Sequence, residues 1–253
     1  MKYFHILIVI FLLAGCATTK NHEKGKTPRD KVLALIEAAQ ASMIERDPIG
    51  ALQYMKAAEG IEPDFAPIHH TKALAFHMRK DFTAALQSMK KCVQLDPDNP
   101  YSNNSLGKML LDASQSKEAE KYLLFAANDH TFRESFKAKT NLGILYYRQG
   151  DLKKADHYFD KATSDDPVSA CIAYYYRGHI AMKTGKLPSA VSYYERASKK
   201  MCAGFTDAHY ALGLAYERNQ QGDLAKKKYL EIKQNFPESA SAEQALQRLK
   251  VLR

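Results

Sequence analysis

The sequence has no tryptophan and few of the residues that make tight turns, with 12 glycines and 9 prolines in 253 residues. An all-β sandwich or barrel needs many such turns, so this scarcity argues against that class. The content of 45% hydrophobic and 26% charged residues is ordinary for a globular protein, which argues against a disordered or collagen-like chain. The glycine motifs of nucleotide-binding loops and the G-x-S-x-G pattern of hydrolases do not occur.

Metal and redox motifs are missing as well. The four cysteines form no C-x-x-C pair, so we expect no zinc or redox site. His70 and His77 lie two helical turns apart, yet no acidic residue or cysteine stands at ligand spacing beside them. Histidines facing a polar groove explain this pattern better. We therefore predict a protein that is not an enzyme and that needs no metal or cofactor.

The first 15 residues resemble a bacterial lipoprotein signal peptide. Lys2 precedes an apolar run of roughly ten residues, too short to cross a bilayer as a stable helix. The run ends in Leu13-Ala14-Gly15-Cys16, which resembles the lipobox, where cleavage leaves the cysteine first and its thiol carries diacylglycerol. A short hydrophobic anchor with a chance cysteine is the alternative. Cys16 is the expected lipidation site, because acyl chains contribute about 0.8 kcal/mol per buried methylene.

Residues 16–30 are polar and are expected to form a flexible tether. Ala17 follows Cys16; in enterobacteria-like sorting an aspartate there holds lipoproteins in the inner membrane. We thus expect a lipid-anchored protein on the periplasmic face of the outer membrane. The chain has 37 Lys and Arg against 28 Asp and Glu, a formal net charge of +9. The lysines and arginines are scattered along the sequence and favour helix ends. The expected periplasmic location argues against nucleic acid as a partner.

The rest of the chain repeats itself. Alanines mark the repeat at steps of 34, 34, 36, 35 and 35 residues. They are Ala51, Ala85, Ala119, Ala155, Ala190 and Ala225. These steps match the tetratricopeptide period. The fourth copy has the fullest pattern, with Leu142-Gly143 and Tyr146 on a first helix, Phe159 on a second helix, and a closing Pro167.

We therefore expect an all-α tetratricopeptide superhelix of about six helix-turn-helix units, followed by a C-terminal capping helix. This domain covers 31–253, with units near 32–65, 66–99, 100–135, 136–170, 171–205 and 206–239 and the capping helix at 240–252. Small residues such as Gly143 and Ala155 are expected where the two helices of a unit cross. One unit cannot bury its own apolar face, whereas a stack can. The curved stack leaves a concave groove lined by the first helices.

The remaining cysteines have separate expected roles. Cys171 begins the first helix of unit five, and Cys202 follows the end of its second helix, so an antiparallel hairpin brings them together. Because the periplasm is oxidising, we predict a Cys171–Cys202 disulfide; two unpaired thiols are the alternative. Cys92 occupies a small buried position of unit two and is expected in the core.

Offsets within the repeat predict which side chains face the groove. These residues are His70, His77, Tyr101, Asn104, Lys108, Asn141, Tyr147, Arg148, Tyr175, His179, Lys183, Tyr210 and Arg218. Tyrosines and cations of this kind are favoured at interfaces, although a tyrosine here could instead pack between units. The Lys and Asn pairs of a chaperone-type carboxylate clamp are missing, because Ile36, Gln40, His70 and Leu74 stand in those places. We expect the groove to bind a peptide or protein segment, extended or β-like.

A six-unit tetratricopeptide lipoprotein of this length resembles the type IV pilus biogenesis lipoproteins of the PilF/PilW type. The more specific likeness is the join between units three and four, which lacks a closing proline, runs through 126–133 and re-enters helix at Asn141-Leu142-Gly143. The resemblance implies a pilotin, an outer-membrane lipoprotein that brings secretin subunits to the outer membrane and promotes their multimerisation. Ala39, where glycine is usual, and Arg177-Gly178 depart from the repeat pattern. An adaptor for peptidoglycan enzymes, a part of outer-membrane protein assembly, or an enzyme with a hidden site remain alternatives.

Overall fold

The computed structural model describes residues 27–252, and this range contains thirteen α-helices, one short 3-10 helix and no strand. The helices are α1 (Pro28–Ile44), α2 (Pro48–Ile61), α3 (Ala66–Met78), α4 (Phe82–Leu95), α5 (Pro100–Asp112), α6 (Ser116–Asn128), α7 (Ser135–Arg148), α8 (Leu152–Asp165), α9 (Cys171–Lys183), α10 (Leu187–Ala197), η1 (Lys200–Cys202), α11 (Thr206–Arg218), α12 (Gly222–Asn235) and α13 (Ala240–Val251). The expected lipidation site, Cys16, lies outside the described residues.

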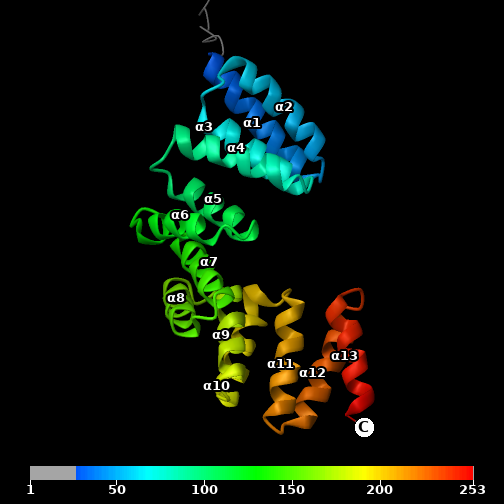
Figure 1. Cartoon of the computed structure of the whole chain (residues 1–253). Coiled ribbons are helices and arrows are strands. Elements are labelled where there is room, and N and C mark those ends of the chain that lie inside the picture. The colour runs from blue at the N-terminus through cyan, green and yellow to red at the C-terminus, as the bar shows by residue number, and fades with distance from the viewer. Residues whose placement is uncertain (1–26, 253) are drawn as a thin grey trace, which may run out of the picture.

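The helices pair into six antiparallel hairpins, from α1–α2 to α11–α12, and each hairpin packs on the next. The hairpins follow one another in a curved, elongated stack, with α1 and α13 at opposite ends (Figure 1). The last helix, α13, packs on α12 and α11 and covers the end of unit six. The expected all-α superhelix of six units with a capping helix is therefore confirmed.

Two expected boundaries were wrong. Helix α1 begins at Pro28, inside the expected tether, because Thr27 and Asp30 form a capping box. The Thr27 hydroxyl accepts the Asp30 amide at 3.1 Å, and the Asp30 carboxylate accepts the Thr27 amide at 2.8 Å. Such a box satisfies amides at a helix start. In the irregular join, α7 begins at Ser135, one residue before the expected start of unit four but six before the Asn141 at which helix was expected to resume, because the buried Phe132 returns the chain to the stack.

The same turn ends the first helix of every unit. The residue two places after the helix has a positive φ; these residues are Arg46, Lys80, Ser114, Gly150, Gly185 and Gln220. The next amide then bonds back to a carbonyl inside the helix, as from Asp47 to Ser42 at 2.8 Å. This Schellman geometry satisfies carbonyls at the helix end. The turns therefore repeat even where glycine is missing.

Within a unit, the two helices cross at a small residue, which is a glycine in units three to six and an alanine in units one and two. In units three to six this glycine faces a large side chain of the second helix; the pairs are Gly107–Leu123, Gly143–Phe159, Gly178–Tyr194 and Gly213–Tyr229. A Cβ added at Gly178 would lie 2.5 Å from Tyr194 Cε1, well inside van der Waals distance. The facing side chains are almost fully buried, so they cannot easily move away. Close packing thus explains the glycines of the repeat.

Polar side chains near the start of the first helices tie neighbouring units together. His69, Asn103 and His209 each occupy the fourth position of their helix. Each side chain reaches a carbonyl six residues earlier: Pro63 at 2.7 Å, Pro97 at 2.8 Å and Ala203 at 2.9 Å. These bonds hold each helix start to the turn that closes the preceding unit. The two histidines are therefore structural.

Unit five carries the expected disulfide between Cys171 and Cys202, whose Cα atoms lie 5.5 Å apart. It joins the start of α9 to the short η1 helix after α10. Cys92 is a buried free thiol, as expected, and its sulfur lies 3.3 Å from the Ser102 hydroxyl.

Replacing Gly143 with alanine should lower the free energy of unfolding by about 1–3 kcal/mol, because the new methyl group overpacks the crossing with Phe159. Gly60→Ala in α2 is the matched control, since no described atom lies within 4 Å of its added Cβ. That variant should be unchanged or gain up to about 1 kcal/mol. Urea denaturation measures both, and equal effects would refute the packing argument.

Removing the disulfide with the pair Cys171→Ser and Cys202→Ser should cost about 3–4 kcal/mol of unfolding free energy, because the unfolded chain regains the entropy of the open loop. Thermal and urea denaturation with and without dithiothreitol test this. The wild type should lose stability on reduction and the double variant should not. A double variant still destabilised by reductant would contradict the assignment.

Candidate functional site: the concave face

The predicted groove residues all lie on the first helices, from α3 to α11. Seven of them line four surface cavities; these are His77, Asn104, Lys108, Asn141, His179, Lys183 and Arg218. The other six, which line none of these four cavities, are His70, Tyr101, Tyr147, Arg148, Tyr175 and Tyr210.

The N-terminal part of the groove is mainly apolar. Two adjoining cavities of about 490 and 140 Å³ lie between α3 and α5 and share His77 and Met109. Leu74 and Phe82 line them and are 41% and 59% exposed. Open apolar surface of this kind is typical of an interaction site rather than of a packed core.

The middle of the groove holds its polar side chains in contacts between units. Asn141 donates to Asn104 at 3.0 Å, from α7 to α5. Arg148 donates to the Leu111 carbonyl at 2.9 Å. The Asp112 carboxylate pairs with Lys108 at 2.6 Å and with Arg148 at 3.8 Å. Much of this polar chemistry is therefore engaged in holding unit four on unit three, beside a cavity of about 570 Å³.

Aromatic rings cover the groove in units four and five. Tyr147 meets Tyr176 edge-on at 5.1 Å, and Tyr175 meets His179 at 4.4 Å between ring centroids. Burial is the main cause that raises the pKa of Tyr175, to about 12, so its hydroxyl stays protonated at neutral pH. Burial first, and then the Lys183 charge, lowers the pKa of His179. The rings thus act as neutral contact surface.

A separate cavity of about 390 Å³ lies between α9, α11 and α13. Its lining includes Arg248 of the capping helix, which the repeat offsets could not predict because the capping helix lies outside the repeats. Arg248 Nε donates to Glu217 at 3.0 Å, and Glu217 also accepts the Tyr229 hydroxyl at 2.6 Å. The bond from Arg248 is the main cause that lowers the pKa of Glu217.

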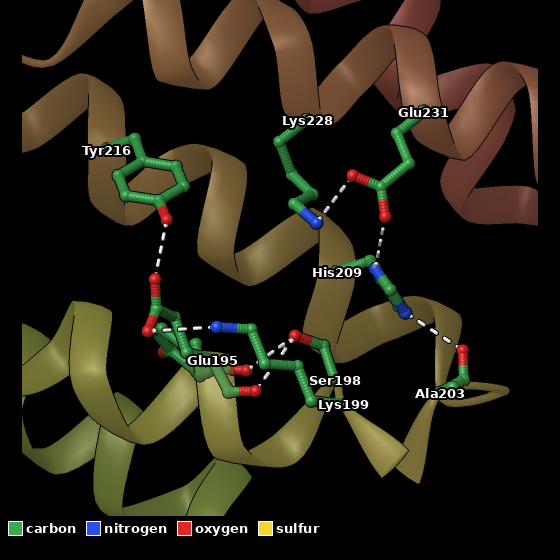
Figure 2. Close-up of polar contacts among 9 residues, drawn as sticks. Glu195, Ser198, Lys199, Ala203, His209, Tyr216, Lys228 and Glu231 are labelled. Atoms are coloured by element: carbon green, nitrogen blue, oxygen red, sulfur yellow. Dashed lines mark hydrogen bonds and ion pairs between the residues drawn. The ribbon is translucent and has the colours of Figure 1, made fainter.

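Of the two buried histidines outside the predicted groove set, His69 and His209, only His209 has an unpartnered ring nitrogen within residues 27–252. His209 sits between α11 and α12, where its Nε2 faces the Ala203 carbonyl and its Nδ1 faces Glu231 at 3.9 Å (Figure 2). Within residues 27–252, this Nδ1 is the buried side-chain atom without a hydrogen-bond partner. Burial first, and then Lys228, lowers the pKa of His209, while Ala203 and Glu231 oppose this. The ring is therefore neutral at pH 7.

Residues 27–252 contain no group of His, Cys, Asp and Glu side chains that could hold a metal ion. In the same range, no helix is both long and apolar enough to cross a bilayer. The concave face offers apolar, aromatic and cationic surface for contact with another molecule.

The fold and the repeated glycine crossings define a helical repeat protein. The chain belongs to the tetratricopeptide repeat family, whose model matches residues 104–170 and 175–240, just over half of the chain. A second tetratricopeptide repeat model matches residues 66–99.

Among individual proteins, the chain is similar to the type IV pilus assembly protein PilF of Pseudomonas aeruginosa, with 26% identity over 161 residues. The match covers 61% of this chain and 64% of that protein, just under two thirds of its length. The solved structure of PilW, a type IV pilus biogenesis factor, has a TM-score of 0.75 at 20% identity and covers 85% of this chain and 98% of its own. The solved structure of Pseudomonas aeruginosa PilF has a TM-score of 0.74 at 18% identity, and the match covers 87% of this chain and 99% of that chain. At these identities the structures show a shared fold.

His209→Asn should flatten the pH dependence of stability. In the unfolded chain a histidine titrates near pH 6.5, and the lowered pKa in the fold means that acid protonates the unfolded state first. Stability is therefore lost as pH falls below about 6.5, and removing His209 removes part of that loss. His70 and His179 also have lowered pKa values, so the variant should retain the part of the pH dependence that these two histidines contribute. Urea denaturation between pH 5 and 7.5 measures the free energy of unfolding of the variant and the wild type at each pH.

The asparagine keeps a donor for Ala203, as Asn103 does for Pro97 in unit three. His209→Ala is the comparison, and it should lose about 1–3 kcal/mol at pH 7 because the carbonyl is left without its donor. An asparagine variant with the full wild-type pH dependence would show that His209 does not titrate between the folded and unfolded states.

Proposed function

We propose that this protein is a non-enzymatic adaptor of the pilotin type, anchored in the outer membrane by lipid on Cys16. In this role it binds secretin subunits of the type IV pilus system on the periplasmic side. It promotes their delivery to the outer membrane and their assembly into multimers.

The similarity to PilF and PilW is the observation that carries the proposal. The lipobox-like Leu13-Ala14-Gly15-Cys16 adds the expected anchor. The surface supports a binding role, because Leu74 and Phe82 are exposed in unit two and the cavity of units five and six adds aromatic and cationic side chains. Such a mixture of apolar and polar contacts suits a protein partner.

The alternative is an adaptor for peptidoglycan enzymes or for outer-membrane protein assembly. It uses the same anchor and the same groove, and differs only in the partner. Affinity purification from crosslinked cells separates the two, because peptidoglycan enzymes or barrel-assembly proteins would replace the secretin among the captured partners.

Deleting the gene should reduce heat-stable secretin multimers on a gel and abolish surface pili. The wild-type gene should restore both. Cys16→Ala should fail to place the multimers in the outer membrane, because a chain without lipid lacks its anchor, while immunoblotting checks that the variant accumulates. Unchanged multimers and piliation in the deletion strain would overturn the proposal.

A further inference from the structure

At one position of the repeat, the type of side chain (apolar, acidic or cationic) differs from unit to unit along the stack. The last residue of the first helix lies five places after the crossing glycine or alanine in every unit; from unit one to unit six these residues are Ile44, Met78, Asp112, Arg148, Lys183 and Arg218. The first two are apolar, the third is acidic and the last three are cations. A helix C-terminus favours a cation, but Ile44, Met78 and Asp112 show that the fold does not require one.

The three cations differ in what they contact. Arg148 is engaged with Asp112 and the Leu111 carbonyl. Lys183 lies over the Tyr147 ring, 4.6 Å from its centroid. Within residues 27–252, neither Lys183 nor Arg218 has a carboxylate within ion-pair distance. Their positive charge is therefore available to a ligand.

Lys183 and Arg218 line the same cavity of about 390 Å³. The third cation of this cavity, Arg248, is already neutralised by Glu217. Apolar and aromatic side chains make up much of the remaining lining; these are Met182, Tyr194, Ala211 and Leu214. The cavity therefore combines two uncompensated cations, from the first helices of units five and six, with an apolar floor.

We propose that this cavity binds an acidic, extended segment of the partner protein. Two Asp or Glu carboxylates pair with Lys183 and Arg218, and an apolar side chain between them enters the cavity. Lys183 and Arg218 line one cavity from the first helices of adjoining units. An extended chain rises about 3.3 Å per residue, so two carboxylates three residues apart span about 10 Å across it. This inference rests on the proposed adaptor function and names the chemistry of its partner.

Two separate carboxylates suit this arrangement better than a single phosphate, because the two cations come from different helices and the cavity between them is lined by apolar groups. A lipid headgroup would place one compact anion against one of them. The proposal therefore commits to a protein segment, and binding to a membrane surface is an outcome that the test must separate.

The test uses synthetic peptides, labelled with fluorescein and amidated at the C-terminus so that only side chains carry negative charge. One peptide of about ten residues, enough to cross three helices at about 3.3 Å per residue, has two aspartates three places apart with a leucine between them. A second has asparagines instead of the aspartates. Fluorescence anisotropy measures binding to the purified domain, residues 27–253, whose N-terminal cut falls ahead of the α1 capping box.

The aspartate peptide should bind at least about tenfold more tightly than the asparagine peptide, the scale of a charge-assisted hydrogen bond. Lys183→Gln and Arg218→Gln should each weaken it by about tenfold. Lys227→Gln, an exposed lysine of α12 that does not line the cavity, is the matched control and should bind as the wild type does. Arg218→Glu should bind a lysine peptide of the same design better than the wild type does.

Equal binding of the aspartate and asparagine peptides, or equal losses in the Lys227 control, would overturn the proposal. Binding to vesicles of anionic phospholipid that depends on Lys183 and Arg218, without peptide binding, would overturn it in favour of a membrane contact. Circular dichroism confirms that each variant is folded. If the peptides fail while gene deletion still abolishes secretin multimers, the ligand chemistry is wrong and the adaptor function stands; unchanged multimers contradict the adaptor function itself.

Discussion

The close crossing of the two helices of a unit, at a glycine in units three to six and at an alanine in units one and two, is the contact on which the rest of the structure depends. At Gly143, Gly178 and Gly213 the first helix lies directly on a buried ring of the second. This contact sets the rotation of the first helix about its own axis, so residues at the same distance from each glycine face the same side of the stack. Each groove position is therefore a row of residues, one from each unit. The chemical character of the groove varies from unit to unit along such a row.

Much of the fold could be predicted because these crossings leave a signal every 34 to 36 residues. The disulfide followed from the same reasoning, since a hairpin brings the ends of its two helices together. The start of α1 was missed although the Thr27–Asp30 capping box is visible in the sequence, because the polar composition around it suggested a tether. The join before α7 was located, but the exact start of α7 at Ser135 depends on where Phe132 is buried, which no local pattern encodes.

The groove was predicted less completely than the fold. Repeat offsets correctly place Lys183 and Arg218 on the first helices, but they cannot tell whether a cation is free or already paired, as Arg148 is with Asp112. They also cannot find Arg248, which belongs to no repeat and reaches the cavity from the capping helix. The contacts of His69 and His209 with backbone carbonyls were not predicted, because a backbone carbonyl carries no sequence signature.

The opposite placement of α1 and α13 has a consequence for electrostatic competition (Figure 1). A lipid anchor ahead of residue 27 would attach the stack at its α1 end, while Lys183 and Arg218 belong to the last two units. Successive helices lie about 10 Å apart, whereas salt screens charge over about 8 Å at physiological ionic strength. If the proposed lipid anchor holds the α1 end at a bilayer and the stack projects from it, the headgroups are too well screened to occupy these two cations, which then stay open to other ligands.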